Sequence, residues 1–180
     1  MLPREGGSHV TDDPDDPGGV TKWGISLRTL AKAGRIDLDN DGYFDFDLDK
    51  DGDIDAADVR AMPFNVAKDF YREIIFEHHN YKRILDQSIT NKIFDITVNM
   101  GARQSHRCVQ RACRAGGRAV VDDGILGPKT LKAINVIAPR ILLHSLRSEQ
   151  AAVYRLIISN NPVMTKYQKG WLRRAYDDNM

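Results

Sequence analysis

The stretch SITNKIFDITVNMGARQSHRCVQRACRA, residues 88–115, contains two helical patterns separated by one glycine, which makes it the clearest indication of fold class in the chain. In the first half, apolar residues such as Ile89 and Ile93 recur at the spacing of one helix face. In the second half, Val109 lies on the apolar side of an otherwise basic helix. Gly101 lies between them, where a glycine commonly ends a helix. Two consecutive amphipathic helices predict a mainly α fold.

Cap and turn residues indicate where the other helices begin and end. Ser26 is a typical N-cap and Gly34 a typical helix end, and proline is favoured in the first turn of a helix. No run of alternating strand residues occurs, so any sheet should be small and lie near the N-terminal third. Further helices are expected over residues 27–33 and 63–78, from Pro128, over residues 139–158, and around Trp171.

The composition, with 42% hydrophobic and 28% charged residues, is typical of a soluble globular protein. No apolar run reaches the roughly 18–20 residues that cross a bilayer, and no secretion leader opens the chain. We therefore expect folding in the cytosol and no membrane span. Cys108 and Cys113 lie five residues apart on an expected helix, so they should point to different sides and stay reduced.

The net charge of +1 conceals two oppositely charged parts. Residues 37–58 hold ten Asp and one Lys, a formal charge of −9, which leaves 25 basic and 15 acidic residues, or +10, elsewhere. A basic body of this kind suits polyanions such as nucleic acid, teichoic acid or lipopolysaccharide. A solvated surface with scattered Arg explains it equally well.

The acidic insert, residues 37–58, contains two copies of the pattern D-x-D-x-D-G-x-Φ-D (Φ apolar), ten residues apart. This is EF-hand spacing, with carboxylates at positions 1, 3, 5 and 9, glycine at position 6 and a backbone carbonyl at position 7. Tyr43 and Asp53 would supply the carbonyls. The predicted ligands are Asp37, Asp39, Asp41, Tyr43 and Asp45 in the first loop, and Asp47, Asp49, Asp51, Asp53, Asp55 and Asp58 in the second.

Ca²⁺ is the cation that these loops predict. Ten crowded carboxylates repel one another, and a hard divalent cation with flexible oxygen coordination relieves that repulsion. Position 12 is Asp58 in the second loop, as in dockerin-type calcium loops, whereas in the first loop it is Leu48, which cannot coordinate through its side chain. The sequence thus predicts one Ca²⁺ and allows two; the alternative is an acidic, disordered linker.

Candidate catalytic carboxylates lie near the start of the chain. Glu5 precedes two glycines, and the segment DDPDDPGG, residues 12–19, is followed by Thr21. A glycosidase needs one carboxylic acid to protonate the leaving oxygen, and a second carboxylate or polar group to hold water or stabilise charge. On spacing alone, an exposed Glu before a loop is the simpler interpretation.

The ordered motifs of the chain resemble those of glycoside hydrolase family 108, the lysozyme-like muramidases of phages and bacteria. Residues 4–26 follow that family's form, EGG and then DPxDPGGxTxxGIS, and residues 65–81 resemble its second helix. The segments FDITVNMGARQSHRCVQRA, DDGILGPKTLKAIN and GWLRRAYD resemble the companion peptidoglycan-binding region. The resemblance implies a lysozyme-like helical fold with a catalytic region over residues 1–90 and a helical peptidoglycan-binding region over residues 91–180. The calcium-loop insert is not a general family feature.

The resemblance also implies the roles of individual residues. Glu5 matches the general acid of a muramidase that cuts between N-acetylmuramic acid and N-acetylglucosamine. Asp16 and Thr21 match the residues that orient the attacking water for inversion, with Asp13 or Asp15 as alternatives to Asp16.

Three further residues are candidates for substrate contact. Trp23 offers a flat apolar face for a sugar ring, His9 is placed at the mouth of the cleft, and Asn99 either contacts substrate or caps its helix.

A phage-type endolysin is the implied biological setting. Its partner would be bacterial peptidoglycan rather than nucleic acid, with contact to lipopolysaccharide or the outer membrane through the basic surface. It would act as a monomer and stay in the host cytoplasm until a holin releases it to the cell wall. The rival functions are a non-catalytic, calcium-dependent wall-binding module and a lytic transglycosylase.

Overall fold

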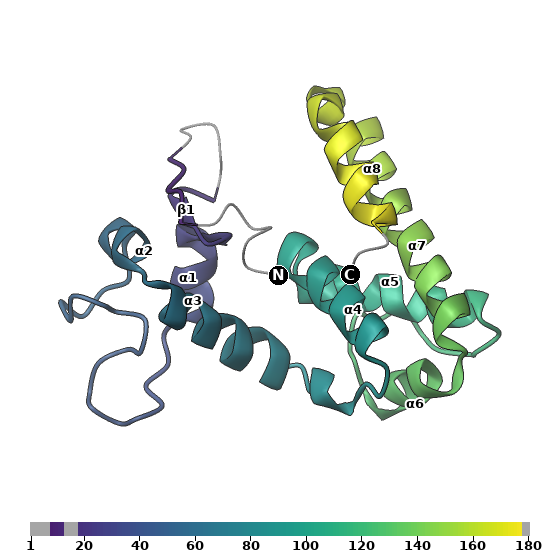
Figure 1. Cartoon of the computed structure of the whole chain (residues 1–180), viewed down its shortest axis with the longest axis horizontal. Coiled ribbons are helices and arrows are strands. Elements are labelled where there is room, and N and C mark those ends of the chain that lie inside the picture. Colours follow the sequence, from purple (N-terminus) through teal and green to yellow (C-terminus); the bar gives the residue numbers. More distant parts are fainter. Residues whose placement is uncertain (1–7, 13–17, 178–180) are drawn as a thin grey trace. The chain divides into compact units, whose positions relative to one another are not determined.

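The computed structural model describes residues 8–12 and 18–177, which form two compact units. Of the described residues, those up to residue 78 form the N-terminal unit and residues 79–177 form the C-terminal unit (Figure 1). Helices dominate both units, and the one small sheet of the described residues lies near the N-terminus. The predicted fold class, mainly α with a small β element in the first third, is confirmed.

The sheet of the N-terminal unit is a two-residue hairpin. Strand β1 (Thr21–Lys22) pairs antiparallel with β2 (Ile25–Ser26). Trp23 and Gly24 connect them with φ angles of 55° and 77°. Positive φ at both turn residues matches the twist of the strands, as in a type I′ turn. This conformation explains why glycine follows Trp23 in the sequence.

Short helices complete the N-terminal unit. Helix α1 (Leu27–Ala33) begins at Ser26, whose hydroxyl accepts the Thr29 amide, and ends at Gly34, as predicted. Helix α2 (Ala56–Ala61) was not expected; it begins at Asp55, within the last part of the acidic insert. The helix expected over residues 63–78 consists of α3 (Phe64–Phe70), which continues as the π-helix η2 (Tyr71–Glu77).

Apolar residues of the acidic insert anchor it to the core of the N-terminal unit. Phe46 is buried, and its ring lies edge-on to Phe70 with a centroid distance of 5.1 Å. Ile54, which lies in the second loop just before α2, is also buried. The insert is therefore packed against the helices through its apolar positions, while most of its carboxylates face outward.

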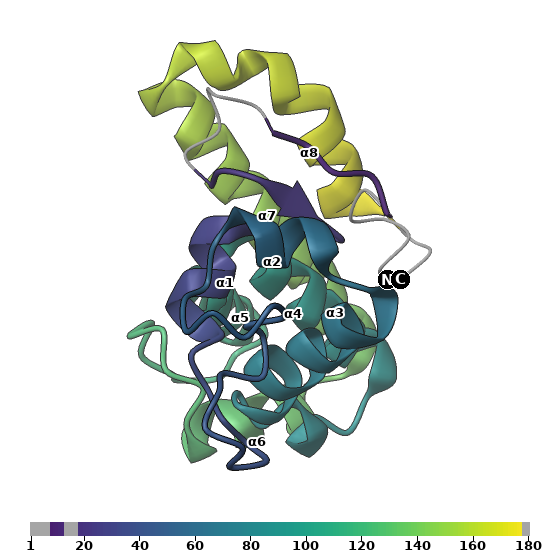
Figure 2. The same ribbon diagram turned by 90° about the vertical axis from the view of Figure 1, so that its left-hand side faces the viewer.

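The C-terminal unit is a helical bundle. The helices expected from residues 88, 104, 128 and 139 and around Trp171 are all present. The 3₁₀ segments η3 and η4 are additional. The elements are η3 (Tyr81–Arg83), α4 (Gln87–Met100), α5 (Ala102–Ala115), α6 (Pro128–Val136), α7 (Pro139–Asn160), η4 (Pro162–Tyr167) and α8 (Gln168–Tyr176). Helices α7 and α8 lie side by side in both views (Figures 1 and 2).

Two thiols belong to the core of this bundle. Cys108 and Cys113 on α5 are free and fully buried, as the sequence predicted. Burial raises the pKa of each thiol to about 11. A thiol of this pKa is almost entirely protonated at neutral pH and a poor nucleophile, so both cysteines act as small apolar side chains.

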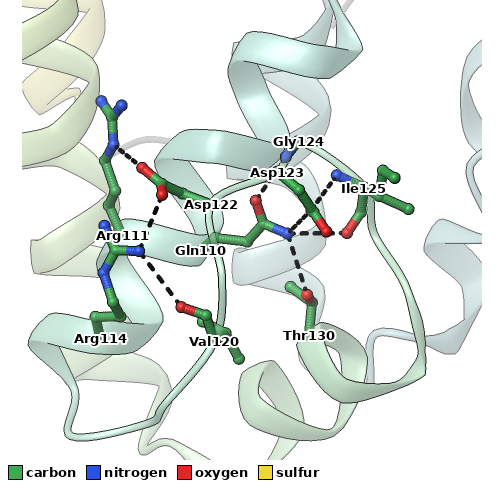
Figure 3. Close-up of polar contacts among 9 residues, drawn as sticks. All are labelled: Gln110, Arg111, Arg114, Val120, Asp122, Asp123, Gly124, Ile125 and Thr130. Carbon is green, nitrogen blue, oxygen red and sulfur yellow. Dashed lines mark hydrogen bonds and ion pairs between the residues drawn. The ribbon is translucent and has the colours of Figure 1, made fainter.

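Gln110 holds the loop between α5 and α6 (Figure 3). Its side chain is buried; its Nε2 donates to Asp123 Oδ1 at 2.7 Å and to the Ile125 carbonyl at 2.9 Å, and its Oε1 accepts the Gly124 amide at 2.9 Å. Gly124 has φ of 81°, and a Cβ there would lie 2.7 Å from the side chain of Arg103. The DDG motif is therefore a structural turn, which the buried side-chain amide of Gln110 holds in place through hydrogen bonds.

Replacing Gln110 with Ala should destabilise this loop strongly. The change leaves the buried Gly124 amide without its acceptor, which costs about 1–3 kcal/mol of unfolding free energy. Denaturant unfolding measures the loss. The matched control is Gln87→Ala, since Gln87 is exposed on the first turn of α4, and its loss should stay within about 0.5 kcal/mol. Equal stabilities of the two variants would contradict the role of Gln110.

A second buried network joins α4, α5 and η3 around His106. The imidazole contacts the Gly124 carbonyl through Nδ1 at 3.1 Å and the Tyr81 hydroxyl through Nε2 at 2.9 Å. The Tyr81 hydroxyl also lies 2.6 Å from Thr97 Oγ1. Burial lowers the pKa of His106 below its ordinary value. The folded protein therefore holds this ring neutral.

Stability should fall with acidification because of His106. Its lowered pKa means that the unfolded chain binds a proton that the folded chain resists, so the loss begins as pH drops through about 6.5, the unfolded value. Denaturant unfolding at pH 7.5 and 5.5 should show a smaller decrease for His106→Gln than for the wild type. The exposed His144→Gln is the control and should retain the full decrease.

Candidate functional site

Three acidic side chains of the second loop converge on one point. One carboxylate oxygen from each of Asp47, Asp49 and Asp58 lies within 4.8 Å of the other two. Asp47 and Asp58 are only 3% and 2% exposed. Burial and the neighbouring carboxylates raise the pKa of Asp49. Carboxylates that are crowded and partly desolvated in this way favour a bound cation.

Asp58 connects the loop to helix α2. Its Oδ1 accepts the Leu48 amide at 2.6 Å, and its Oδ2 accepts the Asp55 amide at 2.8 Å. The second bond completes a capping box, in which the Asp55 side chain caps the helix in return. Helix α2 thereby fixes the residue at position 12 beside position 1 of the same loop.

The first loop forms a looser and more exposed cluster. Asp37, Asp39 and Asp41 also have carboxylate oxygens within 4.8 Å of one another. The ammonium of Lys50, however, lies 2.6 Å from Asp41 Oδ2 and so pairs with one of the three carboxylates of the cluster. The contact with Lys50 lowers the pKa of Asp41. The ammonium of Lys50 therefore already neutralises part of the negative charge of this loop.

The two loops share one backbone conformation. Position 4 is left-handed in both, with φ of 59° at Asn40 and 58° at Lys50, and the glycines at position 6, Gly42 and Gly52, have φ of 92° and 91°. In each loop the amides of positions 5 and 6 donate to the carboxylate of position 1. Of the other predicted ligands, the Asp45 carboxylate accepts the Leu38 amide. The carboxylates of Asp51, Asp53 and Asp55 each accept a backbone amide from one or two residues further along the chain.

The predicted catalytic residues are only partly within the described residues. Thr21 lies on strand β1, where its hydroxyl donates to the Gly19 carbonyl at 3.2 Å and its backbone pairs with Thr11. Glu5 and Asp16, together with the alternatives Asp13 and Asp15, lie outside the described residues.

Two of the predicted substrate contacts belong to this region: Trp23 lies in the turn of the hairpin, and His9 lies two residues before Thr11, which pairs with Thr21. Trp23 is half-buried; its Nε1 donates to the Met62 carbonyl at 3.0 Å, and its ring lies edge-on to Phe64. His9 is exposed. The indole N–H is thus used to join the hairpin to the end of α2, and stacking of Trp23 on a sugar stays a prediction.

The third predicted contact, Asn99, lines a cavity of about 400 Å³ in the C-terminal unit. The cavity lies among α4, α5, α7 and α8. Its polar lining consists of the side-chain amides of Asn99 and Gln104, and its aromatic lining of Tyr154 and Trp171. The remaining lining residues are Met100, Val153 and Ile157.

The family of the chain is established by its sequence over the first part of the molecule. The sequence model of the family described as Glycosyl hydrolase 108 matches residues 1–101, more than half of the 180 residues. The chain belongs to glycosyl hydrolase family 108. A second model, described as Predicted Peptidoglycan domain, matches residues 104–176. This order of regions supports a glycoside hydrolase that acts on peptidoglycan.

A solved structure, titled "Structure of Brucella abortus SagA", is similar to this family 108 protein over nearly its whole length. The two are 22% identical with a TM-score of 0.65, and the likeness covers 99% of this chain and 93% of the other. At this identity the likeness establishes a shared fold. No curated protein sequence matches the chain significantly.

The family boundary differs from the boundary between compact units. The hydrolase model ends at residue 101, so it includes α4, whereas the contacts of α4 with α5 and α7 place it in the C-terminal unit. The reason is the apolar face of α4, on which Ile93 and Ile96 are fully buried. In this family 108 protein, α4 is therefore part of the sequence that the hydrolase model matches, but it packs in the C-terminal unit.

Sequence reasoning missed two contacts that organise the C-terminal unit. The ammonium of Lys92 on α4 is buried and donates to the Ala175 carbonyl of α8 at 2.9 Å, while Arg174 pairs with Asp95 at 2.8 Å. Desolvation lowers the pKa of Lys92 to about 8. Charged residues in the middle of an apolar helix, as in NKIFDI, are the signal that could have indicated them.

Among the described residues, no helix is long and apolar enough to cross a bilayer.

Proposed function

We propose that this protein is an N-acetylmuramidase, which cleaves the β-1,4 bond between N-acetylmuramic acid and N-acetylglucosamine in peptidoglycan. The observation that carries the proposal is the family 108 match over residues 1–101, which includes Glu5 and the DPGG-x-T block, followed by a peptidoglycan domain. Glu5 is the only glutamate before residue 73. It is the proposed general acid, which protonates the glycosidic oxygen as the bond breaks.

Thr21 and Asp16 are the proposed water-orienting residues. The Thr21 hydroxyl donates its hydrogen bond to the Gly19 carbonyl, so its oxygen is left to accept a hydrogen bond from a water molecule. Asp16, three residues before Gly19, would accept the second proton of that water and act as the base. Attack from the face opposite the leaving group inverts the anomeric carbon, and such enzymes separate their carboxyls by about 6.5–9.5 Å.

The end groups of the products test this mechanism. Mass spectrometry of muropeptides released from purified peptidoglycan should show reducing N-acetylmuramic acid ends. Anhydro-muramic ends would instead identify a lytic transglycosylase, which uses a glutamate and no activated water. Intact peptidoglycan together with tight binding would identify a non-catalytic wall-binding module. Reducing N-acetylglucosamine ends would place the cut at the other glycosidic bond.

We also propose that the second acidic loop binds one Ca²⁺. Asp47, Asp49 and Asp58 supply three converging carboxylates, and Ca²⁺ takes oxygen ligands in flexible geometry. The burial of Asp47 and Asp58 supports this, because buried carboxylates without a counter-charge are costly. In the first loop Lys50 already neutralises Asp41, which makes that loop the weaker site. The role proposed for the ion is to hold Asp58 of α2 against Asp47 and Asp49 at the start of the second loop.

The biological setting stays a prediction of the sequence. A phage-type endolysin would act as a monomer and reach the wall from the host cytoplasm through a holin. Contact of its basic surface with lipopolysaccharide belongs to the same prediction.

A further inference from the structure

We propose that the C-terminal unit binds a neutral N-acetylated sugar of the glycan strand in the cavity lined by Asn99, Gln104, Tyr154 and Trp171, here called the aromatic pocket. The inference rests on peptidoglycan being the substrate, as proposed above. It adds a sugar-binding site built from α4, α5, α7 and α8.

The aromatic pocket contains a stack of three rings. Trp171 lies 5.1 Å from Tyr154 and 5.5 Å from Tyr167 between ring centroids, at interplanar angles of 21° in both pairs. The stack fixes the orientation of the indole against the buried Ala151 and Ala175. Tyr167 is 44% exposed, so aromatic surface continues from the pocket to solvent. Aromatic side chains are common in the lining of small-ligand pockets, where they provide apolar contact area for the C–H groups of a ligand.

Asn99 is oriented for an amide ligand. The Tyr154 hydroxyl receives a hydrogen bond from Gln150 Nε2 at 3.0 Å and donates to Asn99 Oδ1 at 2.7 Å. Burial raises the pKa of Tyr154 to about 12, so the hydroxyl keeps the proton that it donates. With its oxygen engaged, Asn99 is left with its Nδ2 hydrogens, and among the described residues they have no acceptor. The carbonyl of an acetamido group is the acceptor that they fit.

The lining of the aromatic pocket is uncharged, which favours the glycan strand of peptidoglycan over the stem peptide as its ligand. The stem peptide carries free carboxylates and an ammonium group, which require charged partners when they are desolvated. Two amides, two rings and three aliphatic or thioether side chains supply none. An N-acetylglucosamine unit is neutral, and its methyl and ring faces match the apolar lining. A volume of about 400 Å³ is in the range of small-ligand pockets.

The indole N–H resonance of Trp171 provides a direct test in the full-length protein. The chain has two Trp residues, so ¹H–¹⁵N spectra contain two indole signals, and loss of one in Trp23→Phe assigns them. Titration with N,N′-diacetylchitobiose should shift the Trp171 signal saturably. The free tetrapeptide stem should leave it in place. A signal that does not respond to the sugar, or that responds only to the stem peptide, overturns the proposal.

Asn99→Ala connects the response to the proposed hydrogen bond. Loss of one hydrogen bond to a neutral ligand should weaken the sugar about 5- to 10-fold. Asn99 is exposed at the end of α4, so the variant should fold. Asn160→Ala, an exposed Asn at the end of α7, is the matched control and should bind like the wild type. Equal affinity of Asn99→Ala and the control contradicts the assigned contact.

Hydrolysis by the wild type separates this proposal from the proposed function. If the wild type releases muropeptides but its Trp171 signal does not shift with added sugar, the sugar site is refuted and the proposed muramidase activity stands. A saturable Trp171 shift without hydrolysis refutes the muramidase and leaves the sugar site standing.

Discussion

Glu5→Gln is expected to reduce hydrolysis of peptidoglycan by about 10²–10⁴-fold in kcat, because general acid catalysis contributes roughly that factor. The carboxamide has nearly the same size as the acid but cannot give a proton to the glycosidic oxygen. Binding to insoluble peptidoglycan should remain unchanged, since the variant keeps its shape and hydrogen-bonding atoms. Release of soluble muropeptides from purified sacculi measures the first quantity, and co-sedimentation measures the second.

The matched control for Glu5 is Glu73→Gln. Glu73 lies on η2, where its carboxylate pairs with Arg72 at 2.8 Å on the surface. Surface pairs of this kind contribute little to stability, so this variant should hydrolyse peptidoglycan within about twofold of the wild type. If Glu5→Gln and Glu73→Gln were equally active, Glu5 would not be the acid and the proposed mechanism would fail.

The same assay identifies the partner of Glu5. Asp16→Asn should lower kcat by a factor comparable to that of Glu5→Gln, whereas Asp13→Asn and Asp15→Asn should have small effects. If the loss fell on Asp13 or Asp15 instead, the water-orienting role would move to that residue and the acid would stay in place. Chemical rescue by azide in the Asp16→Asn variant, with an α- or β-linked product, would further report the stereochemistry of attack.

Removal of Ca²⁺ is the second large effect that we expect. An ion that binds only the folded chain stabilises it by about 2.7 kcal/mol when its concentration is a hundredfold above Kd. Thermal unfolding with excess Ca²⁺ and then with a chelator should therefore differ by several degrees, with the lower Tm in chelator. An identical Tm in the two conditions would exclude a calcium site that matters for folding.

Substitutions locate the ion within the acidic insert. Asp58→Asn removes the ligand charge and replaces one carboxylate oxygen with an amide nitrogen, which cannot coordinate Ca²⁺, so it should abolish most of the calcium-dependent Tm shift. Asp41→Asn should retain the shift if only the second loop binds, and halve it if both do. Asp69→Asn is the control, since Asp69 pairs with Arg72 on the surface outside the insert. Loss of the shift in the control would point to a general charge effect instead.

Short-range features of this protein could be predicted well from its sequence. Ser26, Gly34, Pro128 and Pro139 mark helix ends where the structure has them, because caps and proline act through neighbouring backbone groups. Repeated spacing likewise predicted two equivalent turns, and Gly42 and Gly52 adopt nearly the same φ. The π-helical turn after Phe70 was not predictable, since it depends on how that helix packs.

Residue type and local spacing were sufficient to recognise the family, the mainly α class and the two acidic loops, and they single out Glu5 as the candidate acid. Which of the predicted ligands converge depends on the packing of the chain, because Asp58 reaches Asp47 and Asp49 where α2 folds back onto the loop. Packing likewise brings Tyr154 to Asn99, 55 residues away in sequence. Such pairings depend on helix packing, because buried apolar faces pack only where their shapes are complementary, and the two faces can be far apart in the sequence.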